Sequence, residues 1–178
     1  MSLWWLNFFL ILWTVSVTSF RKLFDIRFES LETIAGDPET LFTYKLRLLG
    51  RDRLINGSIE FLVDLDDTFD VFFVSETLKN GNWVPGYLNT FGKPCEFFSL
   101  YYAPYFQLLS NESNIPTTAS EMCPFPKGEY FVKNGRISTK DWPPIAFRGL
   151  NRYKTRYIKN NKSTGGLQFT FTIIEKIL

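Results

Sequence analysis

Apolar and polar residues alternate along the first half of the chain in the pattern of short β-strands. Residues 24–31 and 44–48 each alternate, which is typical of a strand with one buried face. In the next two segments, residues 59–63 and 69–73, every second residue is apolar. Turn-forming residues such as those at 36–38 separate the segments. Short strands joined by turns predict an antiparallel β-sandwich rather than a βαβ fold.

The middle of the chain breaks this alternation. Asn, Gly and Pro residues over 80–86 predict a long irregular connection. Aromatic and aliphatic residues then recur at spacings of three and four over 96–109, which predicts a short helix that Pro104 should kink or split. Because this helix is apolar nearly all round, it must be buried or must cover something apolar.

The last third of the chain returns to strands. Residues 130–132 begin a strand, and residues 152–157 and 167–173 form a terminal hairpin with its turn somewhere in 160–166. In residues 152–157, three cations alternate with Tyr and Thr, so they share one strand face. That face is either solvated or a contact surface for an anionic headgroup or a receptor.

The first 19 residues have the pattern of a signal peptide. They carry no charged side chain, and their apolar run is shorter than the roughly 20 residues of a transmembrane helix. An uncleaved membrane anchor is the alternative, because Arg21 and Lys22 follow the run. We expect cleavage before Phe20 and a single secreted, extracellular domain over residues 20–178, acting as a monomer.

Composition removes several classes of function. The net charge of +2 argues against a nucleic-acid-binding protein. The chain contains no histidine, the commonest general base and zinc ligand, and it lacks a nucleophile elbow and a phosphate-binding loop. We therefore expect neither an enzyme nor a cofactor. Aromatic residues make up 18% of the chain, which fits either a filled core or an apolar cavity lined with rings.

Clustered aspartates suggest a metal site only weakly. Hard cations bind grouped carboxylates, but the order of these residues does not fit an EF-hand loop. We expect a solvated acidic turn and no bound metal. The residues concerned are Asp64, Asp66, Asp67 and Asp70.

Cys95 and Cys123 are the two cysteines of a chain expected in an oxidising compartment, so we predict that they form a disulfide. In the chain-entropy model, closing this loop stabilises the fold by about 3.5 kcal/mol. Three Asn-x-Ser sequences predict N-glycosylation at Asn56, Asn111 and Asn161.

A run of motifs in the second half of the chain resembles a known family. Residues 123–134 read Cys-Pro-Phe-Pro-Lys-Gly-Glu-Tyr-Phe-Val-Lys-Asn, and Trp142-Pro143-Pro144, Phe147-Arg148-Gly149 and a basic strand follow. This series resembles the insect CheB chemosensory proteins. That family belongs to a larger insect group of domains of unknown function, which is similar to the ML lipid-recognition superfamily. The resemblance covers residues 95 to about 159.

The resemblance implies an ML-like, immunoglobulin-like sandwich whose two sheets separate to admit an apolar ligand. It also implies a role in gustatory or pheromone perception, with a lipid or hydrocarbon as ligand. We expect the walls or lid of such a cavity to come from Phe61, Phe73, Phe97, Phe98, Tyr101, Tyr102, Tyr105, Phe106, Phe169 and Phe171.

The alternative is a packed sandwich that contacts a sensory-neuron receptor or an ion channel. Its candidate contact residues are Trp142, Arg152, Lys154 and Arg156.

Overall fold

The computed structural model describes residues 24–110, 112–118, 120–142 and 148–175. The predicted signal peptide (1–19) therefore lies outside the described residues. No helix in the part of the chain that is described is long and apolar enough to cross a membrane.

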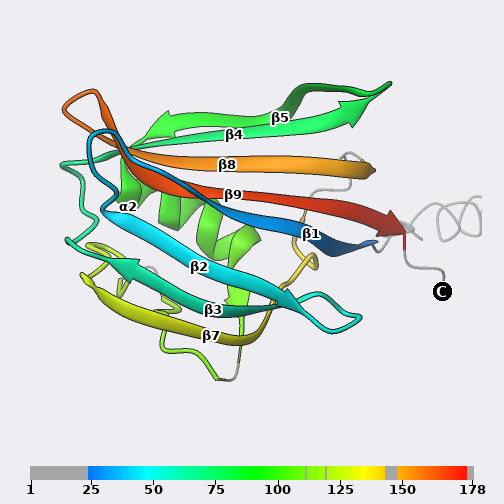
Figure 1. Ribbon diagram of the computed structural model, residues 1–178, viewed down its shortest axis with the longest axis horizontal. Coiled ribbons are helices and arrows are strands. Elements are labelled where there is room, and N and C mark those ends of the chain that lie inside the picture. Colours follow the sequence, from blue (N-terminus) through cyan, green and yellow to red (C-terminus); the bar gives the residue numbers. More distant parts are fainter. Residues whose placement is uncertain (1–23, 111, 119, 143–147, 176–178) are drawn as a thin grey trace, which may run out of the picture.

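Within the described residues, the fold consists of nine strands and one short helical segment (Figure 1). The strands are β1 (Phe24–Ile34), β2 (Phe42–Leu49), β3 (Leu54–Phe61), β4 (Asp70–Lys79), β5 (Asn82–Gly92), β6 (Leu108–Leu109), β7 (Gly128–Ile137), β8 (Gly149–Lys159) and β9 (Lys162–Glu175). The helical segment consists of α2 (Pro94–Phe97) and a π-helix, η1 (Phe98–Phe106).

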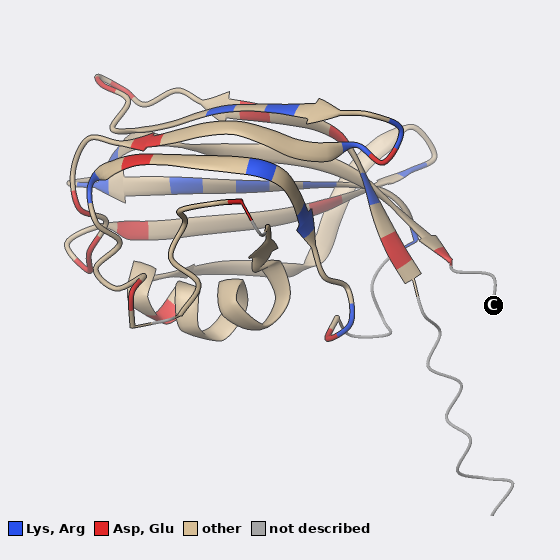
Figure 2. Cartoon of the chain, turned by 90° about the horizontal axis from the view of Figure 1, so that it is seen from below, with Lys and Arg blue, Asp and Glu red and all other residues tan. Residues whose placement is uncertain are grey.

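Hydrogen bonds join the strands into one open sheet with two antiparallel halves. The first half has the order β5-β4-β8-β9-β1, and the second has the order β2-β3-β7-β6. One parallel pair, Phe42 with Gly165, connects them through β2 and β9. The helical segment lies along the open side of this arrangement (Figure 2). The prediction of a mainly-β antiparallel sandwich with a short helical segment is confirmed.

The alternation in the sequence explains which faces are buried. Phe69, Val71 and Phe73 are each 1% exposed, and Phe171 on β9 is fully buried. Phe42 is also fully buried, and its ring contacts Phe61, Phe69 and Tyr157. Aromatic contacts of this kind join both halves of the sheet into one core.

The prediction of an irregular connection over 80–86 is wrong. Asn80 and Gly81 both have positive φ, and they form a two-residue turn between β4 and β5. Pro85 and Gly86 lie at a bulge in β5, an edge strand, where the missing N–H of proline costs little. The turn of the terminal hairpin is also shorter than predicted. It consists of Asn160 and Asn161 alone, and residues 162–166 belong to β9.

The helical segment begins at Pro94 and ends at Phe106, earlier than the predicted span of 96–109 at both ends, and it is not split by Pro104. The wider turns of the π-helix begin at Phe98 and run through Pro104 to Phe106. Residues 108–109 then pair with β7 as β6.

Cys95 and Cys123 form a disulfide that ties the start of the helical segment to the loop before β7, with 5.3 Å between the two Cα atoms. The acidic turn holds the same region in place. Asp67 accepts a hydrogen bond of 3.1 Å from the Cys95 backbone, and Asp64 accepts one of 2.7 Å from the Lys127 backbone. Asp70 pairs with Lys93 at 2.7 Å, and Asp66 caps its own turn at Thr68. These carboxylates thus have partners within the protein, in keeping with a structural turn.

Candidate ligand cavity

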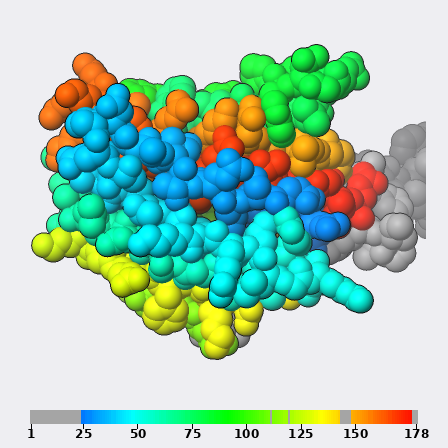
Figure 3. All heavy atoms as spheres, in the orientation of Figure 1, coloured from blue at the N-terminus to red at the C-terminus, as the bar shows by residue number. Residues whose placement is uncertain are grey.

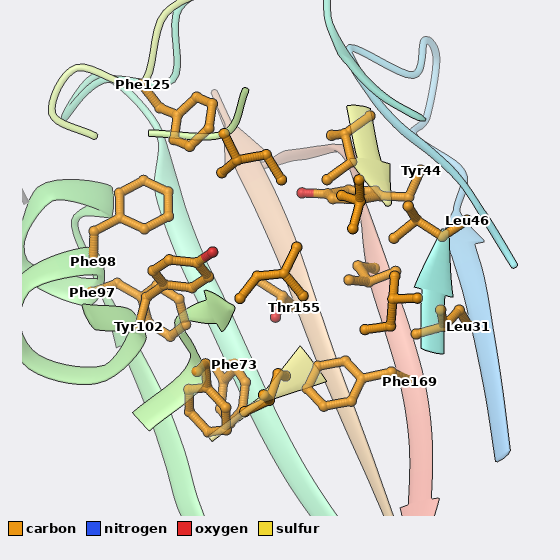
Figure 4. A pocket seen from close by; sticks show the side chains of 18 of the residues that line it. Leu31, Tyr44, Leu46, Phe73, Phe97, Phe98, Tyr102, Phe125, Thr155 and Phe169 are labelled. Atoms are coloured by element: carbon orange, nitrogen blue, oxygen red, sulfur yellow. The ribbon is translucent and has the colours of Figure 1, made fainter. Parts of the chain in front are cut away.

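An apolar cavity of about 140 Å³ lies between the two halves of the sheet, with the helical segment as its third wall (Figure 4). Both halves and the connecting loops contribute side chains. Side chains of β1, β2 and β9 line the cavity, and Figure 3 shows the outer face of these strands. The lining residues are Phe28, Leu31, Tyr44, Leu46, Ile55, Ile59, Phe61, Phe73, Phe97, Phe98, Tyr102, Phe106, Leu108, Ile115, Phe125, Val132, Ile137, Thr155, Tyr157, Leu167 and Phe169.

Seven of the ten wall candidates from the sequence border this cavity: Phe61, Phe73, Phe97, Phe98, Tyr102, Phe106 and Phe169. The other three do not border it. Phe171 is fully buried in the core, and Tyr101 and Tyr105 are partly buried against the core from the helix.

The helical segment is held over the cavity by ring contacts. Phe97 and Phe106 pack against Phe73 of β4, with ring centroids 5.6 and 5.7 Å apart. Phe98 packs against Phe125, at 5.8 Å, in the loop that carries the disulfide. The segment therefore covers the cavity through side chains rather than through backbone pairing.

Trp142 is part of this packing, so its assignment to a partner surface is wrong. It is 8% exposed, and its ring contacts Phe24, Phe106 and Phe171. Its indole N–H donates a hydrogen bond of 2.5 Å to the backbone carbonyl of Tyr105. The indole of this candidate contact residue points into the core. Pro143 and Pro144 lie outside the described residues.

Four hydroxyl groups interrupt the otherwise apolar lining: those of Tyr44, Tyr102, Thr155 and Tyr157. The hydroxyl oxygens of Tyr44 on β2 and Tyr157 on β8 lie 2.8 Å apart, which links the two halves of the sheet. The hydroxyls of Tyr44 and Tyr102 point into the space from opposite sides (Figure 4).

Burial is the largest cause of the raised pKa values of the cavity tyrosines. Burial raises the pKa of Tyr102 to about 12, and a hydrogen bond from the Leu108 backbone acts in the opposite direction. Burial also raises the pKa of Tyr157 to about 12, with the Tyr44 hydrogen bond opposing the shift and the nearby Tyr102 adding to it. For Tyr44, burial and then the neighbouring Tyr157 raise the pKa well above its ordinary value. The hydroxyls are therefore neutral over the physiological pH range.

Sequence reasoning missed Tyr44, Thr155 and Tyr157 as cavity residues. A signal was present, because Thr155 and Tyr157 alternate with the cations of β8 and so face the other way. That signal identifies the buried face of the strand. It does not show that β2 lies opposite.

The cavity is comparable in volume to engineered apolar cavities of about 150 Å³, which stay dry and take up a molecule the size of benzene. Pockets for drug-sized ligands typically have volumes of about 300–1,000 Å³. A long alkyl chain thus requires the helical segment to move outward, or it inserts only part of its length.

The cations of β8 lie on the opposite, outer face of the sheet. Arg152 and Lys154 both pair with Glu76 of β4, at 2.7 and 2.9 Å, and the Arg152 guanidinium lies 4.1 Å from the centroid of the Trp83 ring. Arg156 is exposed. Of the three cations, Arg156 is therefore the one most open to a partner.

The predicted glycosylation sites have different surroundings. Asn161 is exposed in the β8–β9 turn, and Asn111 lies outside the described residues. Asn56 is 8% exposed; its amide donates to the Leu54 carbonyl and accepts a hydrogen bond of 3.1 Å from the Asn134 backbone. A glycan does not fit at this position, so we withdraw Asn56 from the predicted sites.

Residues 69–154 match the model of a family described as a protein of unknown function (DUF1091). The match begins just before β4 and ends within β8, so it includes both cysteines and the whole helical cover of the cavity. A comparison with curated proteins finds no match.

Proposed function

We propose that this protein is a secreted chemosensory protein that binds an apolar lipid or hydrocarbon between the two halves of its sheet. The observation that carries the proposal is the apolar cavity beneath the helical segment. Among the described residues that line it, none carries a charge, and burial of alkyl groups against such walls is worth about 0.8 kcal/mol per CH₂.

Two further observations support the proposed secretion and the proposed chemosensory role. The disulfide fits an oxidising, extracellular compartment. The family match overlaps most of the segment that resembles the insect CheB chemosensory proteins, from Cys95 to about Lys159. On this proposal the protein binds a pheromone-like ligand as a monomer and has no catalytic function, cofactor or metal.

A cavity-filling variant tests the binding site. Leu167 of β9 lines the cavity, so Leu167→Phe should reduce its volume and weaken binding of a fluorescent apolar probe such as N-phenyl-1-naphthylamine. Leu78 on the outer side of β4 is 36% exposed and provides a matched control, Leu78→Phe. We expect at least a tenfold loss of affinity for Leu167→Phe and no change for the control. Equal binding by both variants would contradict the proposed site.

A second candidate function is contact with a sensory receptor or ion channel. The outer face of β4 and β5 exposes Phe72 (38%) and Phe91 (63%), whose ring centroids lie 6.5 Å apart, and Arg156 is the neighbour of Phe72 on β8. Under this hypothesis Arg156→Glu abolishes the behavioural response to the pheromone, yet leaves uptake of the apolar probe unchanged. Loss of both would argue instead for a folding defect.

A further inference from the structure

The hydroxyl groups in the cavity have more protons to donate than acceptors within reach. Tyr44 and Tyr157 share one hydrogen bond, so one of their two protons is used and one remains. The Tyr102 hydroxyl also lines the cavity, and its proton is a further donor. Within the described parts of the chain, no acceptor is found for these two protons.

Thr155 adds a fourth hydroxyl to the same space. It is 7% exposed and lines the cavity from β8, two residues before Tyr157. In the view of Figure 4, Thr155 appears between Tyr102 and Leu31. The hydroxyls thus come from both halves of the sheet and from the helical cover.

Donors without acceptors in an apolar space are unfavourable. A hydroxyl that loses its hydrogen bonds to water on burial costs about 1–3 kcal/mol on the scale of protein mutants. A ligand that places an acceptor oxygen among these hydroxyls recovers this cost, whereas a pure hydrocarbon does not.

The cavity lining also limits the charge that the acceptor oxygen of a ligand can carry. The lining includes no Lys or Arg among the described residues, and the hydroxyls that face the cavity remain neutral. A carboxylate would therefore be buried without a counter-charge, which is costly. A carbonyl oxygen accepts two hydrogen bonds without this cost.

We propose that the ligand carries one uncharged acceptor oxygen, such as the carbonyl of a ketone, aldehyde or ester, and that Tyr102 and the Tyr44–Tyr157 pair bind it. This inference rests on the proposed function, because it assigns the ligand class of the same cavity. Tyr102 and the Tyr44–Tyr157 pair then determine specificity, while the surrounding aromatic rings supply most of the affinity.

Ligands of equal chain length that differ in their polar group distinguish a cavity that binds an acceptor oxygen from one that binds only a hydrocarbon chain. The affinities of a long-chain alkane, the methyl ketone of equal chain length and the corresponding carboxylate are measured by displacement of N-phenyl-1-naphthylamine. We expect the ketone to bind about tenfold more tightly than the alkane, in line with one or two net hydrogen bonds, and the carboxylate to bind more weakly than the ketone at neutral pH.

The variant Tyr102→Phe and the double variant Tyr44→Phe/Tyr157→Phe each remove one free donor and keep the rings. Each should reduce the preference for the ketone to about threefold or less and leave alkane affinity unchanged. Tyr101→Phe is the matched control, because Tyr101 lies on the same helix and does not line the cavity.

Three outcomes overturn the inference while leaving the proposed function intact: equal binding of alkane and ketone, a preference for the carboxylate, or a ketone preference that survives both variants. Failure of all three ligands to bind contradicts the proposed function itself. A ketone preference lost in both variants and kept in Tyr101→Phe supports the assignment.

Discussion

The indole N–H of Trp142 donates a hydrogen bond of 2.5 Å to the backbone carbonyl of Tyr105. This bond fastens the end of η1 to the segment that follows β7. Because the helical segment covers the cavity, the bond also limits how far the cover can open.

Replacing Trp142 should therefore loosen the cover. Trp142→Phe removes the donor but keeps a ring, and we expect a loss of about 1–2 kcal/mol in the free energy of unfolding by urea. Amide hydrogen exchange should accelerate in residues 97–106. Trp83→Phe is the control, because Trp83 lies on the outer face beneath Arg152, and its loss is expected to cost less than about 1 kcal/mol. Unchanged exchange in the helix of Trp142→Phe would show that this bond does not hold the cover.

The pairs on β4 and β8 predict a pH-dependent contribution to stability. Burial raises the pKa of Glu76, but hydrogen bonds from Arg152 and Lys154 and their charges outweigh it, so the pKa lies below its ordinary value. A carboxylate with a lowered pKa in the folded state stabilises the fold above its unfolded pKa, and this contribution is lost as the pH falls through the folded pKa.

Glu76→Gln should thus lower the free energy of unfolding by about 1 kcal/mol at neutral pH, and the difference from the unmodified protein should shrink as the pH falls below the ordinary pKa of a carboxyl group. The control is Glu60→Gln, since Glu60 forms an exposed pair with Lys45 at 3.4 Å. A Glu76→Gln effect that is independent of pH would contradict the ionic origin.

The buried tyrosines predict cooperative unfolding in alkali. Burial raises the pKa values of Tyr102, Tyr153 and Tyr157 to about 12. Groups with raised folded pKa values stabilise the fold fully below their unfolded pKa, and this stability is lost as the pH rises from there through the folded value.

Between pH 10 and 12 these three tyrosines together remove about 8 kcal/mol, which is comparable to the whole stability of a domain. Tyrosinate absorbance and far-UV circular dichroism should therefore change together in this range. Ionisation of all tyrosines near pH 10 with an unchanged dichroism spectrum would show that the cavity hydroxyls are open to solvent.

The environment of Asn56 predicts a pattern of glycosylation. Peptide mapping of the protein secreted from insect cells should show a glycan at Asn161 and none at Asn56. Asn56→Ala should lower stability by about 1–2 kcal/mol, because it leaves the Asn134 backbone N–H without its acceptor. Asn161→Gly keeps the positive φ of the turn and should leave stability nearly unchanged. A glycopeptide containing Asn56 would contradict the buried position of this strand.

The sequence predicts a strand correctly where the alternating apolar residues are also the residues whose side chains are buried. Phe69, Val71 and Phe73 alternate and are all buried as expected. Strand β5 was missed because Pro85 and Gly86 normally end a strand, and only its edge position and bulge make them acceptable.

The cavity was only partly predictable, because its walls come from segments that are distant in the sequence. The aromatic helix points to an apolar surface beneath it, and seven of the ten predicted wall residues line the space, four of them from the helical segment itself. The pairing of Tyr44 with Tyr157 depends on how two strands separated by 113 residues approach each other, which no local pattern encodes. Trp142 was misplaced for the same reason, since its neighbours Phe24 and Phe171 lie at opposite ends of the chain.

The most direct test of ligand binding is native mass spectrometry of the protein secreted from insect cells, followed by organic extraction of any bound molecule. We predict a stoichiometric adduct that is released as a lipid or hydrocarbon. A protein that carries its disulfide but no adduct, and that acquires none after incubation with long-chain alkenes and ketones, would contradict a ligand-binding cavity.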